Sequence, residues 1–462
     1  MSEPNPTLIH VLTSCLSPDS AVRAPAESTL GTSAAQAHGI TIQLLDVILA
    51  AATVPPQVRA LAATCLKNCV AKRWKRVQTH AFAPAEKSQA RVRCASCLFI
   101  PEPHIFRVVV ATMAKMLRTD WSADEWPDLL PNIVALASSA DASSARRGMQ
   151  ALHAIVKELS SISLFSEKQR FNATSPHIAA VVAPAWQQLL PLVPSSAEAA
   201  ESARTVAKIY KHALMRIPAL AVPGGAVFSF FESCCQVVAF TSDICSGRTA
   251  SAIHEQIIAL TRTLLACMRV CIKALPVHCS LILPNLAGAC VQILVSSKTA
   301  HSVNDSAASL ACSAMSVLET IFYENIYKHG SVSRVTNDPA VKLQAEAAFG
   351  SFFTETTVVQ LVELLACSYC NLSPAQLARW EESPEAFSNE CDAQVGILRY
   401  TVCTHSPPDL FVSSATCCRL AAPFASSCNW PIDYQMQVCS FFNPDPLFSP
   451  SLGQWVRAFS SC

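Results

Sequence analysis

Glycine is scarce in this chain, with 11 residues among 462. Because glycine supplies most turns with positive φ and many strand bends, its scarcity argues against a β-barrel or a β-sandwich. The chain is instead rich in Ala and Leu, which favour helix. Its 29 prolines fit the same fold if they stand at helix starts and in connections, where a missing N–H donor does little harm. We therefore predict an all-α protein.

Charge is also low, since 15% of the residues are charged and 51% are hydrophobic. The segment Ala274–Ser297 contains no Lys, Arg, Asp or Glu. A membrane-spanning helix needs about 20 predominantly apolar residues, whereas Pro276, Pro284 and Asn285 interrupt this segment. We predict a buried helix here and no membrane insertion. The N terminus lacks the basic start and apolar core of a secretory signal, so we expect the protein in the cytosol or nucleus.

Catalytic motifs are missing as well. The sequence contains no GxxxxGK, GxGxxG, HExxH or GxSxG pattern, and its histidines are scattered without metal-ligand spacing. His153 lies on an apolar helical pattern, where a packing role is the simpler interpretation. We predict that the protein is not an enzyme and needs no cofactor or metal.

Cysteine, by contrast, is abundant, with 22 residues. Cys94 with Cys97, and Cys367 with Cys370, have the spacing of zinc or redox pairs, but the two pairs lie too far apart in sequence for a zinc ribbon. Residues three apart on a helix also share one face, so we predict that these cysteines are small core residues. The alternative is a thiol-dependent enzyme built on Cys94 and Cys97, which would require a lowered thiol pKa.

Apolar residues recur with helical period in segments of three to five turns joined by short links. Two helices with their turns occupy about 40 residues, the spacing of HEAT or armadillo units, so we predict a right-handed α-solenoid of such repeats. Asp141 is a predicted helix cap, Ser122 with Glu125 has capping-box spacing, and Pro127 has the character of a first-turn proline. The predicted helices are 4–16, 21–33, 41–52, 57–73, 85–99, 103–118, 127–139, 142–160, 177–192, 251–275 and 303–325.

The segment Arg59–Trp74 combines an apolar stripe with a polar one. Leu61, Cys65 and Cys69 recur at intervals of four on one side of the predicted helix, with Val58, Ala62, Leu66 and Val70 beside them. Thr64, Lys67, Asn68, Lys72 and Lys75 fall on the other. One side is predicted to pack and the other to be offered to a partner.

This segment carries a resemblance to a known family. Arg59, the runs Leu61-Ala62-Ala63 and Leu66-Lys67-Asn68, and Trp74 resemble the signature of the importin-beta N-terminal domain, with Ala26-Glu27 and Leu30 upstream. The stretch from Glu102-Pro103 to RTDWSADEWPDLLP (118–131) is similar to the next repeat of these nuclear transport receptors. NLSPAQLARWEESPEAF (371–387) resembles a loop and helix of one branch of the family.

The resemblance implies a function and partners. Importin-beta relatives bind the GTPase Ran in its GTP state through N-terminal repeats, and the matched positions Arg59, Lys67 and Asn68 are the implied contacts. The other implied partners are protein cargo, carried into the nucleus, and nuclear pore proteins, with the receptor shuttling between nucleus and cytoplasm. The alternative is a HEAT-repeat scaffold indifferent to Ran. The implied domains are 1–100, the N-terminal domain; 101–393, further repeats; and 394–462, a divergent tail.

Two features bear on this interpretation. The cluster Lys72, Arg73, Lys75 and Arg76 around Trp74 could form a nucleic-acid patch, but the net charge of +1 and the dipole-complementing role of cations at a helix C terminus favour no direct nucleic-acid contact. Residues 401–462 contain no Lys or Glu, yet seven prolines and six cysteines. We expect a poorly ordered Pro/Cys-rich tail at the end of a truncated form of a longer receptor, one lacking the acidic excess that attracts basic cargo.

Overall fold

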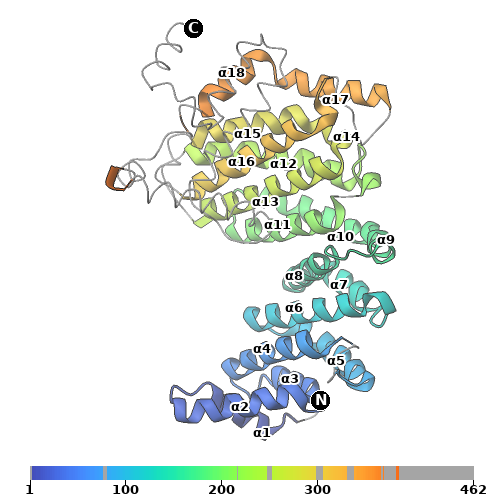
Figure 1. Ribbon diagram of the computed structural model, residues 1–462, viewed down its shortest axis with the longest axis vertical. Helices are drawn as coiled ribbons and strands as arrows, with labels where there is room; N and C mark the ends of the chain where they lie inside the picture. The colour runs from blue at the N-terminus through green and yellow to red at the C-terminus, as the bar shows by residue number, and fades with distance from the viewer. Residues whose placement is uncertain are drawn as a thin grey trace. The chain divides into compact units, whose positions relative to one another are not determined.

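The computed structural model describes residues 3–75, 81–215, 217–246, 252–297, 305–329, 338–365, 368 and 381–383. Within these ranges every regular element is a helix and no strand occurs (Figure 1), which confirms the predicted all-α fold. The α-helices are α1 (Pro6–Cys15), α2 (Ser20–Gln36), α3 (Ile40–Leu49), α4 (Pro56–Arg73), α5 (Pro84–Ser96), α6 (Pro103–Asp120), α7 (Leu129–Ala137), α8 (Ala142–Leu159), α9 (Phe165–Ala173), α10 (Ser175–Leu189), α11 (Ala197–Ile209), α12 (Ala226–Ser246), α13 (Ala252–Ala274), α14 (Pro276–Cys279), α15 (Leu283–Ser297), α16 (Asp305–Tyr323), α17 (Pro339–Phe352) and α18 (Glu355–Leu364). Short helical turns are η1 (Cys97–Phe99), η2 (Trp121–Ala123), η3 (Leu190–Leu192), η4 (Tyr210–Leu214), η5 (Pro218–Leu220), η6 (Ser280–Ile282) and η7 (Asn325–Tyr327).

The chain divides into two compact units. Unit 1 contains residues 1–189 and 205–217, and unit 2 contains residues 190–204 and 218–462. The boundary between the two units falls inside residues 101–393, which we predicted from the sequence to be one run of repeats. The predicted domain boundaries near 100 and 393 stay predictions, and the predicted tail lies outside the described residues.

Unit 1 is a stack of helix pairs. α1 packs on α2, α3 on α4, and α7 on α8, while corresponding helices of successive pairs also pack, α3 on α5, α4 on α6, and α6 on α8. Figure 1 shows α4, α6 and α8 following one another through this stack. Each pair buries its apolar stripe against its neighbours, the arrangement of HEAT-type repeats. The predicted solenoid is therefore present.

Helix starts follow simple local chemistry. Pro56, Pro84 and Pro103 each occupy the first turn of a helix, where the absent N–H would have no partner in any case. Asp141 accepts a hydrogen bond of 2.8 Å from the backbone N–H of Ser144 and so caps α8, as predicted. These signals explain why most predicted helices match the observed bounds within a few residues.

The predicted capping box at Ser122 and Glu125 is wrong. Ser122 lies inside the 3₁₀ turn η2, after which Asp124 takes a left-handed φ of 53°. The next helix, α7, begins only at Leu129, so Pro127 stands before its first turn rather than in it. Glu125 instead pairs with Arg91. The short polar helix α9 has no counterpart among the predicted helices.

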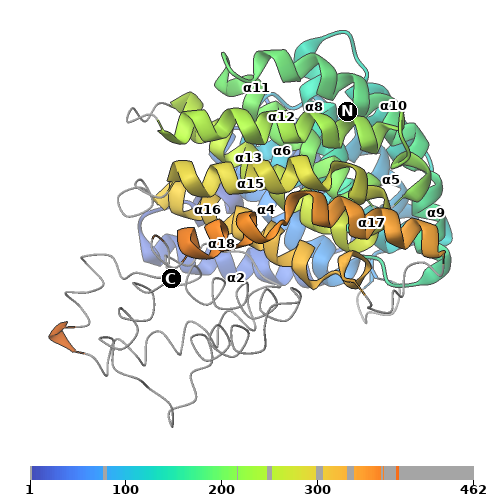
Figure 2. The ribbon, with the colours of Figure 1, turned by 90° about the horizontal axis from the view of Figure 1, so that it is seen from above.

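Unit 2 repeats the pairing with longer helices. α12 packs on α13 and α15 on α16, and α12 also packs on α15 and α13 on α16. Figure 2 shows these four helices lying side by side. Thr241 and Thr261 join α12 to α13 by a buried hydrogen bond of 2.7 Å, and the Tyr327 hydroxyl donates 2.7 Å to the carbonyl of Pro276. Buried polar groups in unit 2 are thus used to connect helices.

Two stretches of unit 2 are long and apolar enough to cross a membrane, Pro276–Ser297 and Ser306–Tyr323. Length and composition are weak evidence, because the core helix of a soluble fold passes the same test. Pro276–Ser297 is in fact broken into α14, η6 and α15, and α15 packs on α12, α16 and α17. This packing supports the predicted buried helix at 274–297.

Gly148 is required where α8 approaches α7. A Cβ built at this position would lie 2.5 Å from Ala137 Cα and 2.6 Å from the Leu136 carbonyl carbon, and backbone cannot yield as a flexible side chain can. We expect Gly148→Ala to lower the free energy of unfolding by about 2 kcal/mol, because the two helices must separate. The measurement is urea unfolding followed by circular dichroism.

Gly31, in the interior of α2, is the matched control. Nothing lies within 4 Å of a Cβ built there, so Gly31→Ala adds only helix propensity and should raise stability by roughly 0.5–1 kcal/mol. Equal shifts in the two variants would contradict the close approach of α7 and α8.

Candidate partner-binding surface

Helix α4 has one buried and one exposed face. Val58, Ala62, Leu66, Cys69 and Val70 are buried, whereas Leu61 and Cys65 are partly exposed. Thr64, Lys67, Asn68, Lys72 and Lys75 are exposed. The predicted packing face is therefore buried except for Leu61 and Cys65, which lie at its edge, and the predicted polar face is exposed.

Lys67 and Asn68 lie in the middle of the exposed face. Neither side chain bonds to another described residue, so both are available to a partner. An ammonium group and an adjacent carboxamide can together bind a carboxylate and a backbone amide of an incoming protein. These two positions remain the predicted contacts.

Arg59 occupies a different environment from these two residues. Its side chain is buried, with Nε donating 2.8 Å to the carbonyl oxygen of Ile48 and a terminal nitrogen pairing with Glu102 Oε1 at 2.5 Å. Although desolvation acts in the opposite direction, the hydrogen bond and charge of Arg59 hold the pKa of Glu102 below its usual value. A guanidinium that bonds to Ile48 in α3 and to Glu102, the residue before α6, cannot also reach solvent. Its role in this structure is to fix α4 in place.

The C-terminal end of α4 is fixed by Trp74. The indole Nε1–H donates 2.9 Å to Asp120 Oδ1 at the end of α6, and Asp120 also accepts two bonds from Arg91, at 2.8 and 3.0 Å. Trp74 is buried, as is Trp121, whose indole donates 3.1 Å to the Glu167 carbonyl. Both act as packing anchors, while Trp126 is only partly buried.

Arg73 does not belong to a surface patch. Its guanidinium donates 3.1 Å to the carbonyls of both Ala34 and Ala37 at the end of α2, and lies 4.3 Å from the ring centre of Phe82. It thus satisfies carbonyls that a helix C terminus leaves without partners. Arg73 is therefore buried and cannot contribute to a nucleic-acid patch, and Arg76 lies outside the described residues.

The predicted core role of the paired cysteines agrees with their surroundings. Cys94 and Cys97 are buried free thiols, and burial raises the pKa of Cys94 well above its usual value and that of Cys97 to about 12. A thiol-dependent enzyme would need the opposite shift. The part of the chain that the structure describes contains no cluster of three potential metal ligands. Cys367 and Cys370 lie outside it.

His153 in α8 is partly buried. Burial lowers its pKa to about 3, and the positive charges of Lys208, His212, Lys157 and Lys211 act in the same direction. Its ring centre lies 6.0 Å from that of His212. A neutral imidazole packed among cations fits the predicted packing role.

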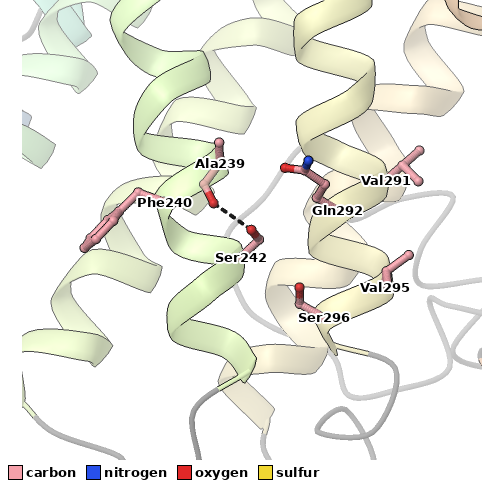
Figure 3. Close-up of a pocket in the computed structure, with 7 residues that line it drawn as sticks. All are labelled: Ala239, Phe240, Ser242, Val291, Gln292, Val295 and Ser296. Carbon is pink, nitrogen blue, oxygen red and sulfur yellow. Dashed lines mark hydrogen bonds between the residues drawn. The ribbon is translucent and has the colours of Figure 1, made fainter.

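A groove lies in unit 2 between α12 and α15. Its volume is about 650 Å³, and its lining is formed by Ala239, Phe240, Ser242, Val291, Gln292, Val295 and Ser296. Figure 3 shows Gln292 and Ser242 on the facing sides of the groove and Phe240 directed away from α15. The partly exposed Val295 and Phe240 give the groove apolar edges. No sequence motif predicts this groove.

Comparison with known proteins gives the following likenesses. The importin-beta N-terminal domain profile matches residues 32–99, which contain α4. Importin-11 of Mus musculus is 24% identical over 401 residues, covering 83% of this chain and 40% of that protein. Importin-11 of Homo sapiens is 24% identical over 404 residues with the same coverage. The chain therefore spans about 40% of the length of these curated relatives.

Solved structures show the same fold. Lph2, a bidirectional nuclear transport receptor of S. cerevisiae, superposes with a TM-score of 0.70 at 17% identity, covering 97% of this chain and 43% of that one. The exportin Cse1 in its cargo-free, cytoplasmic state gives a TM-score of 0.61 at 11% identity, covering 91% and 42%. The relatives are transport receptors and not enzymes, and they agree with the family resemblance of the sequence motifs. Most of the branch-typical motif at 371–387 lies outside the described residues.

Proposed function

We propose, from the likeness of this chain to importin-beta relatives, that it acts as a nuclear transport receptor which binds Ran in its GTP state through α4. The observation that carries the proposal is the exposed pair Lys67 and Asn68, inside the matched N-terminal domain. Arg59 and Trp74 fix the two ends of α4 against its neighbours, so the pair is presented on a rigid helix. A rigid surface loses little conformational entropy on binding.

Protein cargo and nuclear pore proteins complete the proposed set of partners, with import into the nucleus as the direction and shuttling between nucleus and cytoplasm as the consequence. The groove between α12 and α15, with Gln292 and Ser242 on its facing sides and Phe240 and Val295 at its edges, is the surface of unit 2 that we assign to a pore protein. Cargo release on Ran binding would then be a coupling free energy between two sites.

We expect the double variant Lys67→Ala/Asn68→Ala to bind Ran-GTP at least about tenfold more weakly than the unaltered chain, the effect of losing one interface hot spot. The measurement is capture of the chain on immobilised Ran loaded with a non-hydrolysable GTP analogue or with GDP. Because both side chains are exposed, the thermal transition of the variant should be unchanged.

The matched control is Lys168→Ala, which removes an exposed cation from α9. It should leave capture intact. Equal capture by the GTP and GDP forms, or none by either, would favour the alternative function of a HEAT-repeat scaffold without a role in transport.

A further inference from the structure

Charge is unevenly distributed along the chain although the net charge is close to zero. Residues 1–217 contain 22 Lys and Arg against 15 Asp and Glu, whereas residues 218–462 contain 12 against 18. The first part of the sequence therefore carries a net positive charge and the second part a net negative charge. A field of one sign over a surface attracts partners of the other sign.

Much of the acidic charge of unit 1 is used internally. Glu86 accepts 2.5 Å from the Thr41 hydroxyl and 3.0 Å from the Gly39 N–H, and Asp46 pairs with Arg93 at 2.9 Å. Glu102 and Asp120 are occupied by the contacts at the two ends of α4. The cations on the outward faces of α4, α6 and α8 are consequently not neutralised by these acids.

The three helices run parallel and in register. The start of α4 is tied to the start of α6 by Arg59 and Glu102, and their ends are tied by Trp74 and Asp120. The last turns of α6 and α8 meet through Arg118 and Glu158, at 3.5 Å. Residues at equivalent positions therefore lie beside one another across the stack.

This register brings cations from four successive elements together. Lys157 precedes Glu158 in the last turn of α8, and Lys115 lies one turn before Arg118 on the same face of α6. Lys72 stands in the last turn of α4, which the contact of Trp74 with Asp120 places level with the end of α6. The turn η4 lies beside the end of α8, because the hydroxyl of Ser160 is 3.1 Å from His212 Nδ1. We call the resulting set the basic row, and it consists of Lys72, Lys115, Arg118, Lys157 and Lys211.

The surroundings of His153 support a positive field at this end of the helices. Two members of the basic row, Lys157 and Lys211, are among the charges that disfavour protonation of its imidazole, although burial is the larger cause. Within the described last turns of α4, α6 and α8, Glu158 is the acid that reaches the surface, and Arg118 pairs with it.

We propose that the basic row binds an extended acidic segment of a protein partner. Packed helices are about 8–10 Å apart, and an extended chain advances about 3.3 Å per residue, so every third residue of a crossing segment meets a new helix. Four of the five cations are lysines, and the tryptophans that follow α4 and α6, Trp74 and Trp121, are buried, so they cannot serve as the base-stacking platforms that single-stranded nucleic acid uses. The site extends the proposed function but does not depend on it.

The test uses the full chain and fluorescence anisotropy with a labelled peptide of about twelve residues, with Glu at every third position and Ser between. We expect the peptide to bind, and Lys115→Glu and Lys157→Glu each to weaken binding roughly five- to tenfold, because reversal replaces attraction by repulsion. Lys168→Glu, which makes the same charge change on α9, should leave the affinity unchanged. The neutralising variant Lys115→Gln, which avoids a new carboxylate, should show a smaller loss of the same sign.

Several results would overturn the proposal. They are the absence of peptide binding, equal binding of a peptide with the same glutamates clustered at one end, tighter binding of an oligothymidylate, and losses no larger than that of Lys168→Glu. A row that only complements helix dipoles would change the melting temperature without changing peptide affinity. Because Lys67 and Asn68 are intact in these variants, capture on Ran-GTP tests the proposed function separately.

Discussion

Replacing Arg59 by Ala should destabilise unit 1 by about 3 kcal/mol, one of the two largest effects that we expect from a single substitution. The change removes a buried guanidinium, leaves the Ile48 carbonyl without its donor and takes the partner from Glu102. The measurement is chemical unfolding of the full chain with circular dichroism at neutral pH. Weakened Ran-GTP capture with unaltered stability would instead identify Arg59 as a direct contact.

The stability lost in Arg59→Ala should depend on pH. Arg59 lowers the pKa of Glu102, so the stabilisation from this pair is fully present above the ordinary carboxyl pKa of 4.5 and is lost as the pH falls through the folded value. The difference between the unaltered chain and the variant should therefore narrow in acid. Glu102→Gln, which keeps the size of the side chain, should remove this part of the pH dependence.

Replacing Trp74 by Ala should cost about 4 kcal/mol, comparable with other buried aromatic truncations. Trp74 is 1% exposed, packs edge-on against Phe82 with ring centres 6.2 Å apart, and supplies Asp120 with one of its hydrogen bonds. The truncation therefore leaves both a cavity and an underbonded carboxylate. Thermal unfolding in the presence of a reducing agent measures the loss.

Two further variants separate the effect of the cavity from that of the lost hydrogen bond to Asp120. Trp74→Phe retains most of the volume but not the donor, and should cost about 1–2 kcal/mol because Arg91 still pairs with Asp120. Trp126→Ala truncates a partly exposed tryptophan and should have a smaller effect. If Trp74→Ala and Trp126→Ala are equally stable, Trp74 does not fix the end of α4.

The helices could be predicted because their signals are local. Apolar period and first-turn prolines are visible in the sequence, and the segment 57–73 corresponds to α4 at Pro56–Arg73. The region between Trp121 and Leu129 could not be predicted in the same way, since the left-handed turn at Asp124 depends on contacts such as that of Arg170 with the Trp121 carbonyl. Residues far apart in sequence decide the backbone there.

The division between surface and core was harder to predict for arginines. Arg59 and Arg73 lie on the same face of α4 as Leu66 and Cys69, and this position indicates burial. Arginine side chains are mostly exposed in proteins, however, so the residue type predicts the opposite. Glu102 and the carbonyls of α2 make burial possible, and both come from other repeats. The basic row could not be predicted from the sequence for the same reason, because its residues come together only through the alignment of α4, α6 and α8.

The buried thiols have a consequence for handling this protein. Cys94, Cys97, Cys234 and Cys290 are enclosed and protonated in the native state, so peroxide and alkylating reagents meet little thiolate while the chain is folded. Unfolding in air would expose a cysteine-rich chain, 22 in total, to random crosslinking. Loss of structure would then become irreversible, and the lifetime of the protein would be set by its opening rate.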